Sequence, residues 1–140
     1  MSDPIPPPQA CRPEEAAALV SLAVSDGDLG AAVAQYEPAA SLRPWAAGEL
    51  DDGTVRGAMS AVMRLRLPLD TRLVAVLPAT GLTMLVCERS IDGAGPDGEP
   101  VRLRGFGCTV VRPQSDGSWR IAADAWRLAE PGDGDGRPVP

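Results

Sequence analysis

The stretch DGSWRIAADAW, residues 116–126, combines a turn signal with an apolar strand that contains a single acid. Its opening Asp and Gly are typical of a hairpin turn, and the residues that follow alternate as a half-buried strand does. Asp124 lies among small apolar residues, two positions before Trp126. Alternation predicts a shared face for Arg120, Ala122, Asp124 and Trp126. An acid on the same face as a core Trp indicates that this strand lines a ligand cavity.

Three apolar runs upstream show the same strand period. They cover residues 71–77, 82–89 and 101–112, and turn signals rich in Gly, Pro and Asp separate them. The turn DGAGPDG, residues 92–98, offers backbone amides, but it joins two strands rather than opening a helix, so we interpret it as a hairpin tip. Together with the last strand over residues 118–126, these runs predict a meandering antiparallel sheet.

Helical periodicity dominates the first half of the chain. It predicts helices over residues 13–27, 28–37 and 55–63. Asp28 and Thr54 are good N-caps for the second and third helices. The second helix is expected to carry Tyr36 on its apolar face and to end at Pro38. Helices that precede a strand meander predict an α+β domain.

The two ends of the chain differ in composition from its middle. Residues 1–11 are rich in Pro, and residues 130–140 contain mainly Gly, Pro and Asp. Neither segment can bury enough apolar surface to offset the entropy of ordering, so we expect both to be flexible tails. Residues 12–129 then form one domain, which is long enough to bury a core.

The basic residues are all Arg, since neither Lys nor His occurs. The 13 basic and 19 acidic residues give a net charge of -6, so we expect neither nucleic acid nor a membrane surface as a partner. Without His we expect no metal and no cofactor, and acid–base chemistry must use Asp, Glu, Tyr or Cys. Three widely spaced Cys and the lack of a signal peptide favour a cytoplasmic protein with reduced thiols.

The order of these elements, with the phrases SDGDLGAAVAQYEPAASL and DGSWRIAADAW, resembles the nuclear transport factor 2-like superfamily. It is most similar to the SnoaL-like and ketosteroid-isomerase-like branch of small bacterial proteins, over about residues 14–128. The resemblance implies a cone-shaped α+β barrel, in which three N-terminal helices pack in a strongly curved, mainly antiparallel sheet. Such cones hold a small molecule at the open end, and the outer face of the sheet commonly forms a homodimer.

The resemblance can be followed residue by residue. The isomerases of this branch place a general-base Asp about eight residues after the aromatic that ends the second helix; counted from Tyr36, this position holds Pro44. Their second acid lies on the strand that corresponds to residues 101–112, which contains no acid. Their active-site Trp falls on Trp126. The resemblance therefore implies a retained cavity and does not support a steroid-isomerase mechanism.

Asp124 and Tyr36 are the two candidate catalytic residues. A carboxylate in an apolar cavity is the arrangement by which enzymes tune an acid or a base. The alternative for Asp124 is a structural ion pair with Arg104 or Arg120. Tyr36, the only Tyr, could donate a hydrogen bond to a ligand carbonyl. Its alternative is a core residue whose hydroxyl reaches solvent.

The candidate ligand-binding residues are apolar or aromatic, with one Arg. They are Trp126, Phe106, Arg104, Trp45, Met59, Met63, Met84 and Cys108. Those on the strand over residues 101–112 share one face, and they line the cavity only if that face is concave. On a convex face they belong to a dimer interface or to solvent. The methionines suit an adaptable cavity wall or, as the alternative, plain core.

These observations predict a protein that binds a hydrophobic small molecule in the cone, such as a polyketide-like intermediate of secondary metabolism. As an enzyme it would catalyse a cofactor-free cyclisation, isomerisation or hydration, with Asp124 as the acid–base group. The alternative is a non-catalytic ligand-binding or accessory module that docks on a biosynthetic partner. A third possibility is a purely structural dimer with a filled cone.

Overall fold

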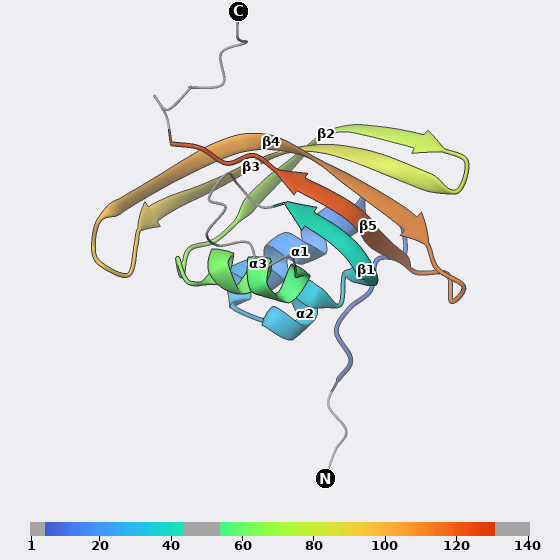
Figure 1. Cartoon of the computed structure of the whole chain (residues 1–140), viewed down its shortest axis with the longest axis horizontal. Helices are drawn as coiled ribbons and strands as arrows, with labels where there is room; N and C mark the ends of the chain where they lie inside the picture. The colour runs from blue at the N-terminus through green and yellow to red at the C-terminus, as the bar shows by residue number, and fades with distance from the viewer. Residues whose placement is uncertain (1–4, 44–53, 131–140) are drawn as a thin grey trace, which may run out of the picture.

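The computed structural model describes residues 5–43 and 54–130, and it places the helices under one strongly curved sheet (Figure 1). The elements follow in the order α1 (Glu15–Asp26), α2 (Leu29–Val33), β1 (Tyr36–Arg43), α3 (Val55–Met63), β2 (Asp70–Ala79), β3 (Leu82–Ala94), β4 (Pro100–Pro113) and β5 (Trp119–Trp126). The strand order is β1-β5-β4-β3-β2. The predicted α+β architecture of three helices packed on a curved sheet is confirmed. The sheet is not closed, so the cone is not a complete barrel.

The strand β1 lies where the periodicity of the sequence predicts the second half of a helix. α2 ends after a little more than one turn, with Ala34 as its C-cap, and Tyr36 begins the strand. β1 runs parallel to β5, whereas the other strand pairs are antiparallel. Because β1 is an edge strand, it tolerates Pro38, which has no N–H to donate to a neighbour. The helix predicted over residues 28–37 is therefore wrong in its second half.

The predicted helix caps of α2 and α3 are present. The carboxylate of Asp28 accepts a hydrogen bond from the Ala31 N–H at 3.1 Å. The hydroxyl of Thr54 accepts one from the Gly57 N–H at 2.9 Å. Each cap satisfies one of the amides that a helix start leaves without an intrahelical partner. These local signals fix where α2 and α3 begin under the sheet.

A bulge in β5 changes which residues face the helices. The register between β4 and β5 shifts by one residue at Ala122. Beyond the bulge, Asp124 and Trp126 share the buried face, as the alternation predicts. Before it, Ile121 is the fully buried residue, and Arg120 is only half-buried. The prediction that Arg120 and Ala122 share the face of Asp124 is therefore wrong.

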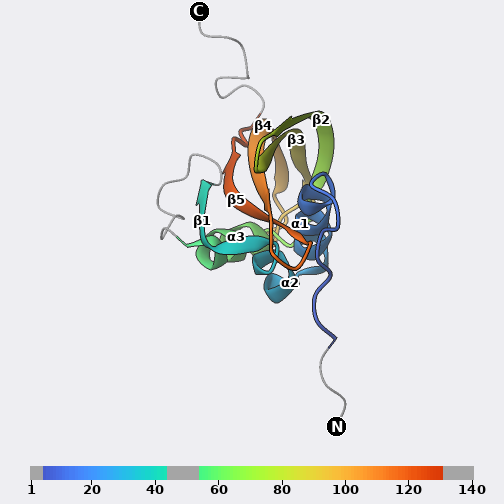
Figure 2. The same ribbon diagram turned by 90° about the vertical axis from the view of Figure 1, so that its right-hand side faces the viewer.

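The helices lie on the concave side of the sheet (Figure 2), and the core residues come from both of these layers. α1 contributes Val20 and Val24 to it, and α3 contributes Met59 and Val62. Along β3 the buried residues alternate with more exposed ones. The buried set of β3 is Thr83, Leu85, Cys87, Arg89 and Ile91. This alternation places one charged side chain on the helix-facing side of the sheet.

The packed part of the chain begins before residue 12, the predicted domain boundary. Ala10 is fully buried, and its carbonyl accepts a hydrogen bond from the Trp119 N–H at 2.9 Å. The predicted N-terminal tail therefore includes a residue that pairs with β5. Among the described residues, no helix has both the length and the apolar character that crossing a membrane requires.

Candidate functional site

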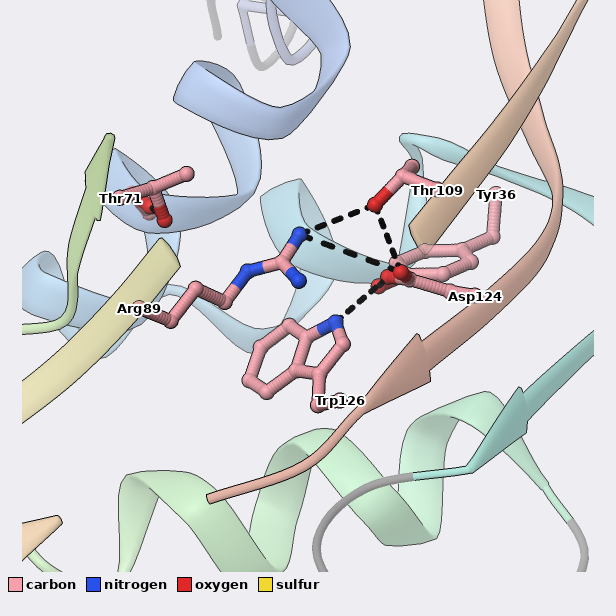
Figure 3. Close-up of polar contacts among 7 residues, drawn as sticks. Tyr36, Thr71, Arg89, Thr109, Asp124 and Trp126 are labelled. Carbon is pink, nitrogen blue, oxygen red and sulfur yellow. Dashed lines mark hydrogen bonds and ion pairs between the residues drawn. The ribbon is translucent and has the colours of Figure 1, made fainter. Parts of the chain in front are cut away.

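Asp124 is the centre of a buried polar cluster on the concave side of the sheet (Figure 3). Its Oδ2 atom accepts hydrogen bonds from the Tyr36 hydroxyl and from the Trp126 indole N–H, both at 2.7 Å. Its Oδ1 atom accepts one from the Thr109 hydroxyl, also at 2.7 Å. Three donors thus converge on one carboxylate that is only 4% exposed.

Arg89 provides the positive charge of this cluster. Its Nη2 atom donates to the Thr109 hydroxyl at 3.0 Å and lies 3.9 Å from Oδ1 of Asp124. The centre of its guanidinium lies 4.5 Å from the centroid of the Trp126 ring, within the range of a cation–π contact. A buried carboxylate needs such a partner, because burial removes the water that would otherwise solvate it.

Four strands contribute to the cluster. Thr109 of β4 lies directly opposite Asp124 of β5, and Tyr36 comes from the start of β1 on the other side of β5. Arg89 comes from β3 and crosses β4 at Gly107. A Cβ atom at Gly107 would lie 3.0 Å from Nη1 of Arg89, so the bare backbone there leaves room for the guanidinium.

Asp124, Tyr36 and Trp126 were predicted from the sequence, whereas Arg89 and Thr109 were not. The alternative for Asp124 was an ion pair with Arg104 or Arg120, and the structure instead shows Arg89 as its partner. A signal for Arg89 was present, because this residue falls on the same alternation as the apolar residues of its strand. A charge in an apolar stripe requires a buried partner of opposite charge.

Burial determines the protonation of Tyr36. The pKa of Tyr36 is raised well above its ordinary value of 10.0, first by burial and then by the nearby Asp124 carboxylate and the hydrogen bond to it. The hydroxyl therefore stays protonated and remains a hydrogen-bond donor. Its alternative interpretation, a hydroxyl that reaches solvent, is wrong, since Tyr36 is 3% exposed and bonded to Asp124.

Several predicted ligand-binding residues lie on the outer face of the sheet instead. Arg104, Phe106 and Cys108 belong to the exposed alternation of β4, and Phe106 is 57% exposed. Met84 lies on the less buried face of β3, and Arg89 lies on the opposite, buried face. The prediction that these residues line the same cavity as Asp124 is therefore wrong. The convex placement, which the sequence left open, applies.

The other predicted contact residues lie in the helix layer or outside the described residues. Met59 is fully buried in α3, and Met63 is half-buried near the end of this helix. Both pack in or against the core, which matches the plain-core alternative. Trp45 and Pro44 lie outside the described residues.

A pocket of about 880 Å³ opens beside the cluster, between β1 and the start of α3. Tyr36 is the one residue of the cluster that lines it. The other lining residues are Val33, Ala34, Glu37, Pro38, Ala39, Ala40, Ser41, Leu42, Thr54, Val55, Arg56 and Arg120. The pocket therefore reaches Tyr36, whereas Asp124 does not line it. Within residues 5–43 and 54–130, no three Cys, Asp or Glu side chains gather in a way that could hold a metal ion.

No family model matches this chain, and no curated protein matches its sequence. Solved structures do match its fold. A ketosteroid isomerase-like protein from Erwinia carotovora atroseptica is 15% identical with a TM-score of 0.67, over 85% of this chain and 95% of that one. This chain has the nuclear transport factor 2-like fold.

Two further structures with the nuclear transport factor 2-like fold are similar. A Δ5-3-ketosteroid isomerase from Mycobacterium sp. is 16% identical with a TM-score of 0.56, over 84% of this chain and 96% of that one. A proposed dehydratase of the NTF2-like family from Streptomyces avermitilis is also 16% identical, with a TM-score of 0.63 over 80% of this chain and 90% of that one. At such identities the comparison shows the fold alone, so the chemistry must be argued from this chain's own residues.

Proposed function

We propose that this chain binds a hydrophobic small molecule on the concave side of the sheet and acts on it as a cofactor-free isomerase, cyclase or hydratase. The observation that carries the proposal is the convergence of Tyr36, Thr109, Trp126 and Arg89 on the buried Asp124 carboxylate. Polar groups that converge on one point inside an apolar core are the arrangement that acid–base catalysis needs. The relatives named as an isomerase and as a proposed dehydratase support the same reaction classes.

The proposed chemistry moves one proton. The Asp124 carboxylate takes a proton from an acidic C–H or O–H of the ligand and returns it to a different ligand atom, so the reaction involves no net oxidation. Tyr36 remains protonated, and its single O–H bonds Asp124 before the reaction. Once Asp124 has gained the proton, this O–H turns to the ligand oxygen that gains negative charge. Thr109 and Trp126 fix the orientation of the carboxylate. We propose a polyketide-like intermediate of secondary metabolism, rich in acidic C–H groups, as the ligand class.

The outer face of the sheet supports a second part of the proposal, a homodimer in the cytoplasm. The exposed apolar residues that fall on this face by strand register are Leu77 of β2, Leu82 of β3 and Phe106 of β4. Exposed apolar side chains on one face of a sheet are typical of interaction sites on folded proteins. A second copy of the chain offers the same face, so one patch can cover the other about a twofold axis.

Native mass spectrometry followed by hydrogen–deuterium exchange tests the catalytic role. The protein is isolated from its producing host, and any bound small molecule is released by denaturation and identified. In D₂O the wild type should exchange deuterium into an acidic position of this molecule. Asp124→Asn should lower the exchange rate by at least about 100-fold, because the proton acceptor is lost.

Glu88→Gln is the matched control, since Glu88 is a carboxylate of β3 on the less buried alternation and pairs with Arg72. It should exchange at the wild-type rate. Exchange by Asp124→Asn at that same rate would contradict the proposed role of the carboxylate.

A non-catalytic binding module is the second candidate function. The observation that favours it is that both Asp124 oxygens already accept hydrogen bonds from protein donors. Under this alternative the cluster stabilises the cone, and the ligand is held without reaction. A released metabolite with no exchange in the wild type would support this second candidate.

A further inference from the structure

We infer that Arg89 provides a binding position for an anionic oxygen of the ligand, through its Nε and Nη1 atoms. The inference deepens the proposed function and rests on it, since a ligand must enter the concave side of the sheet. It adds a chemical class: an apolar molecule that carries a carboxylate, an enolate or a phenolate oxygen. Nε and Nη1 lie on the same guanidinium that faces Asp124 (Figure 3).

The first observation is an incomplete set of hydrogen bonds. The Arg89 side chain is only 2% exposed. In the part of the chain that the structure describes, neither Nε nor Nη1 has an acceptor. A guanidinium carries five N–H donors, of which Nε holds one and Nη1 holds two. Buried N–H groups are almost always paired, so these three donors point to an acceptor that enters from outside the chain.

The second observation is that the guanidinium is already held in place. Its Nη2 atom bonds Thr109 and faces the Asp124 carboxylate, and the guanidinium carbon lies over the Trp126 ring. The guanidinium is planar, so these contacts fix its orientation, and Nε and Nη1 keep their donors free of protein acceptors among the described residues. At Gly107, next to Nη1, no side chain competes for these donors. A preorganised donor pair of this kind favours a charged oxygen over a neutral one.

The positive charge of Arg89 is balanced by the anionic oxygen of the ligand when Asp124 is protonated. Before binding, Arg89 and Asp124 form one ion pair and cancel. When Asp124 takes the proton of a ligand O–H or C–H, the negative charge moves to the ligand oxygen, and Arg89 can pair with that oxygen in place of the carboxylate. A carboxylate that arrives already charged reaches the same state if Asp124 takes up a proton from solvent. A ligand that arrives as an anion therefore takes up a proton from solvent on binding, whereas a ligand that gives its own proton to Asp124 does not.

The test compares three probes of the same shape: 2-naphthoate, 2-naphthol and neutral 2-naphthamide. Calorimetry in buffers of different ionisation enthalpy gives their affinities and the protons taken up. NMR of the ¹⁵N-labelled protein follows the Arg89 Nε–H signal. We expect a shift of this signal with naphthoate and naphthol, and an affinity for naphthoate at least about tenfold higher than for naphthamide. Proton uptake with naphthoate but not with naphthol distinguishes a ligand that is charged before binding from one that gives its proton to Asp124.

Arg89→Lys keeps a positive charge near Asp124 but removes the planar fork, so it should abolish the preference for naphthoate. Arg102→Lys is the matched control, because Arg102 is an exposed Arg on β4 paired with Asp92. If Arg89→Lys does not fold, the wild-type NMR signal decides the question. Equal affinity for naphthoate and naphthamide, or an unshifted Arg89 signal, would overturn the inference and leave the proposed function standing. No binding of any probe would overturn both.

Discussion

Tyr36 is the residue whose chemistry the structure changes most clearly. It is the only Tyr of the chain, and its hydroxyl is bonded to a buried carboxylate. Forming a phenolate there would place two negative charges in direct contact without water. The residue is therefore a permanent hydrogen-bond donor, and its titration can be followed without interference from other tyrosines.

Ultraviolet titration at 295 nm should show this directly. We expect no tyrosinate absorbance in the folded protein as the pH passes 10.0, the ordinary pKa of tyrosine. The reason is that burial and Asp124 raise the pKa of Tyr36. The unfolded chain does lose this proton near pH 10, so the unfolded state binds fewer protons there than the folded state. The free energy of unfolding should thus fall as the pH rises above 10. A tyrosinate midpoint near 10 in protein that is still folded would contradict this.

At the scale of the elements, β4 passes very close to the backbone of β5 at Gly107. A Cβ atom at Gly107 would lie 2.2 Å from the carbonyl oxygen of Ala125, in addition to its approach to Arg89. The clash is with backbone, which cannot rotate away as a side chain can. The coiling of the sheet that brings Arg89 to Asp124 therefore depends on a glycine at this position.

Gly107→Ala should lower the free energy of unfolding by about 2 kcal/mol or more, because β5 must move to admit the methyl group. Urea denaturation followed by tryptophan fluorescence measures the change. Gly30→Ala in α2 is the matched control: its Cβ atom would lie 3.7 Å from the nearest atom, an ordinary contact, so it should leave stability unchanged or raise it by up to about 1 kcal/mol. Equal effects of the two substitutions would refute the steric argument.

Local patterns predicted much of the fold and part of the site. Helix caps and strand alternation depend on neighbours in sequence, so α1, α3 and β2 to β5 were expected at nearly their observed positions. β1 was missed because Tyr36 continues the apolar spacing of α2. The bulge at Ala122 and the role of Arg89 depend on pairing between distant strands, which a single sequence does not show. Asp124 was found because an acid in an apolar stripe is visible locally.

At the scale of the whole molecule, the two faces of the sheet have different roles. The concave face holds the core and the Asp124 cluster, while the convex face exposes apolar side chains on β2, β3 and β4. Phe106 is the most exposed of the aromatic or large apolar residues on that sheet face. This separation lets a dimer contact form without closing the side of the cone on which the site lies.

Light scattering after size-exclusion chromatography should give a mass of two 14.5 kDa chains. Phe106→Asp should shift the protein to a single chain, because a charge in the middle of an apolar interface loses its solvation. Leu22→Asp is the matched control: Leu22 is 61% exposed on α1, away from the sheet, and its replacement should leave the mass unchanged. A monomeric wild type would refute the proposed dimer.

The parallel pairing of β1 with β5 also determines when the site can exist during synthesis. Tyr36 and Asp124 are 88 positions apart, and a ribosome releases the N-terminal part of a chain first. The helices and β1 are thus made long before the strand that covers them, and contacts over such separations form slowly. β2, β3 and β4 emerge first and supply part of the core, and β5, the last strand to be made, completes both the core and the carboxylate cluster.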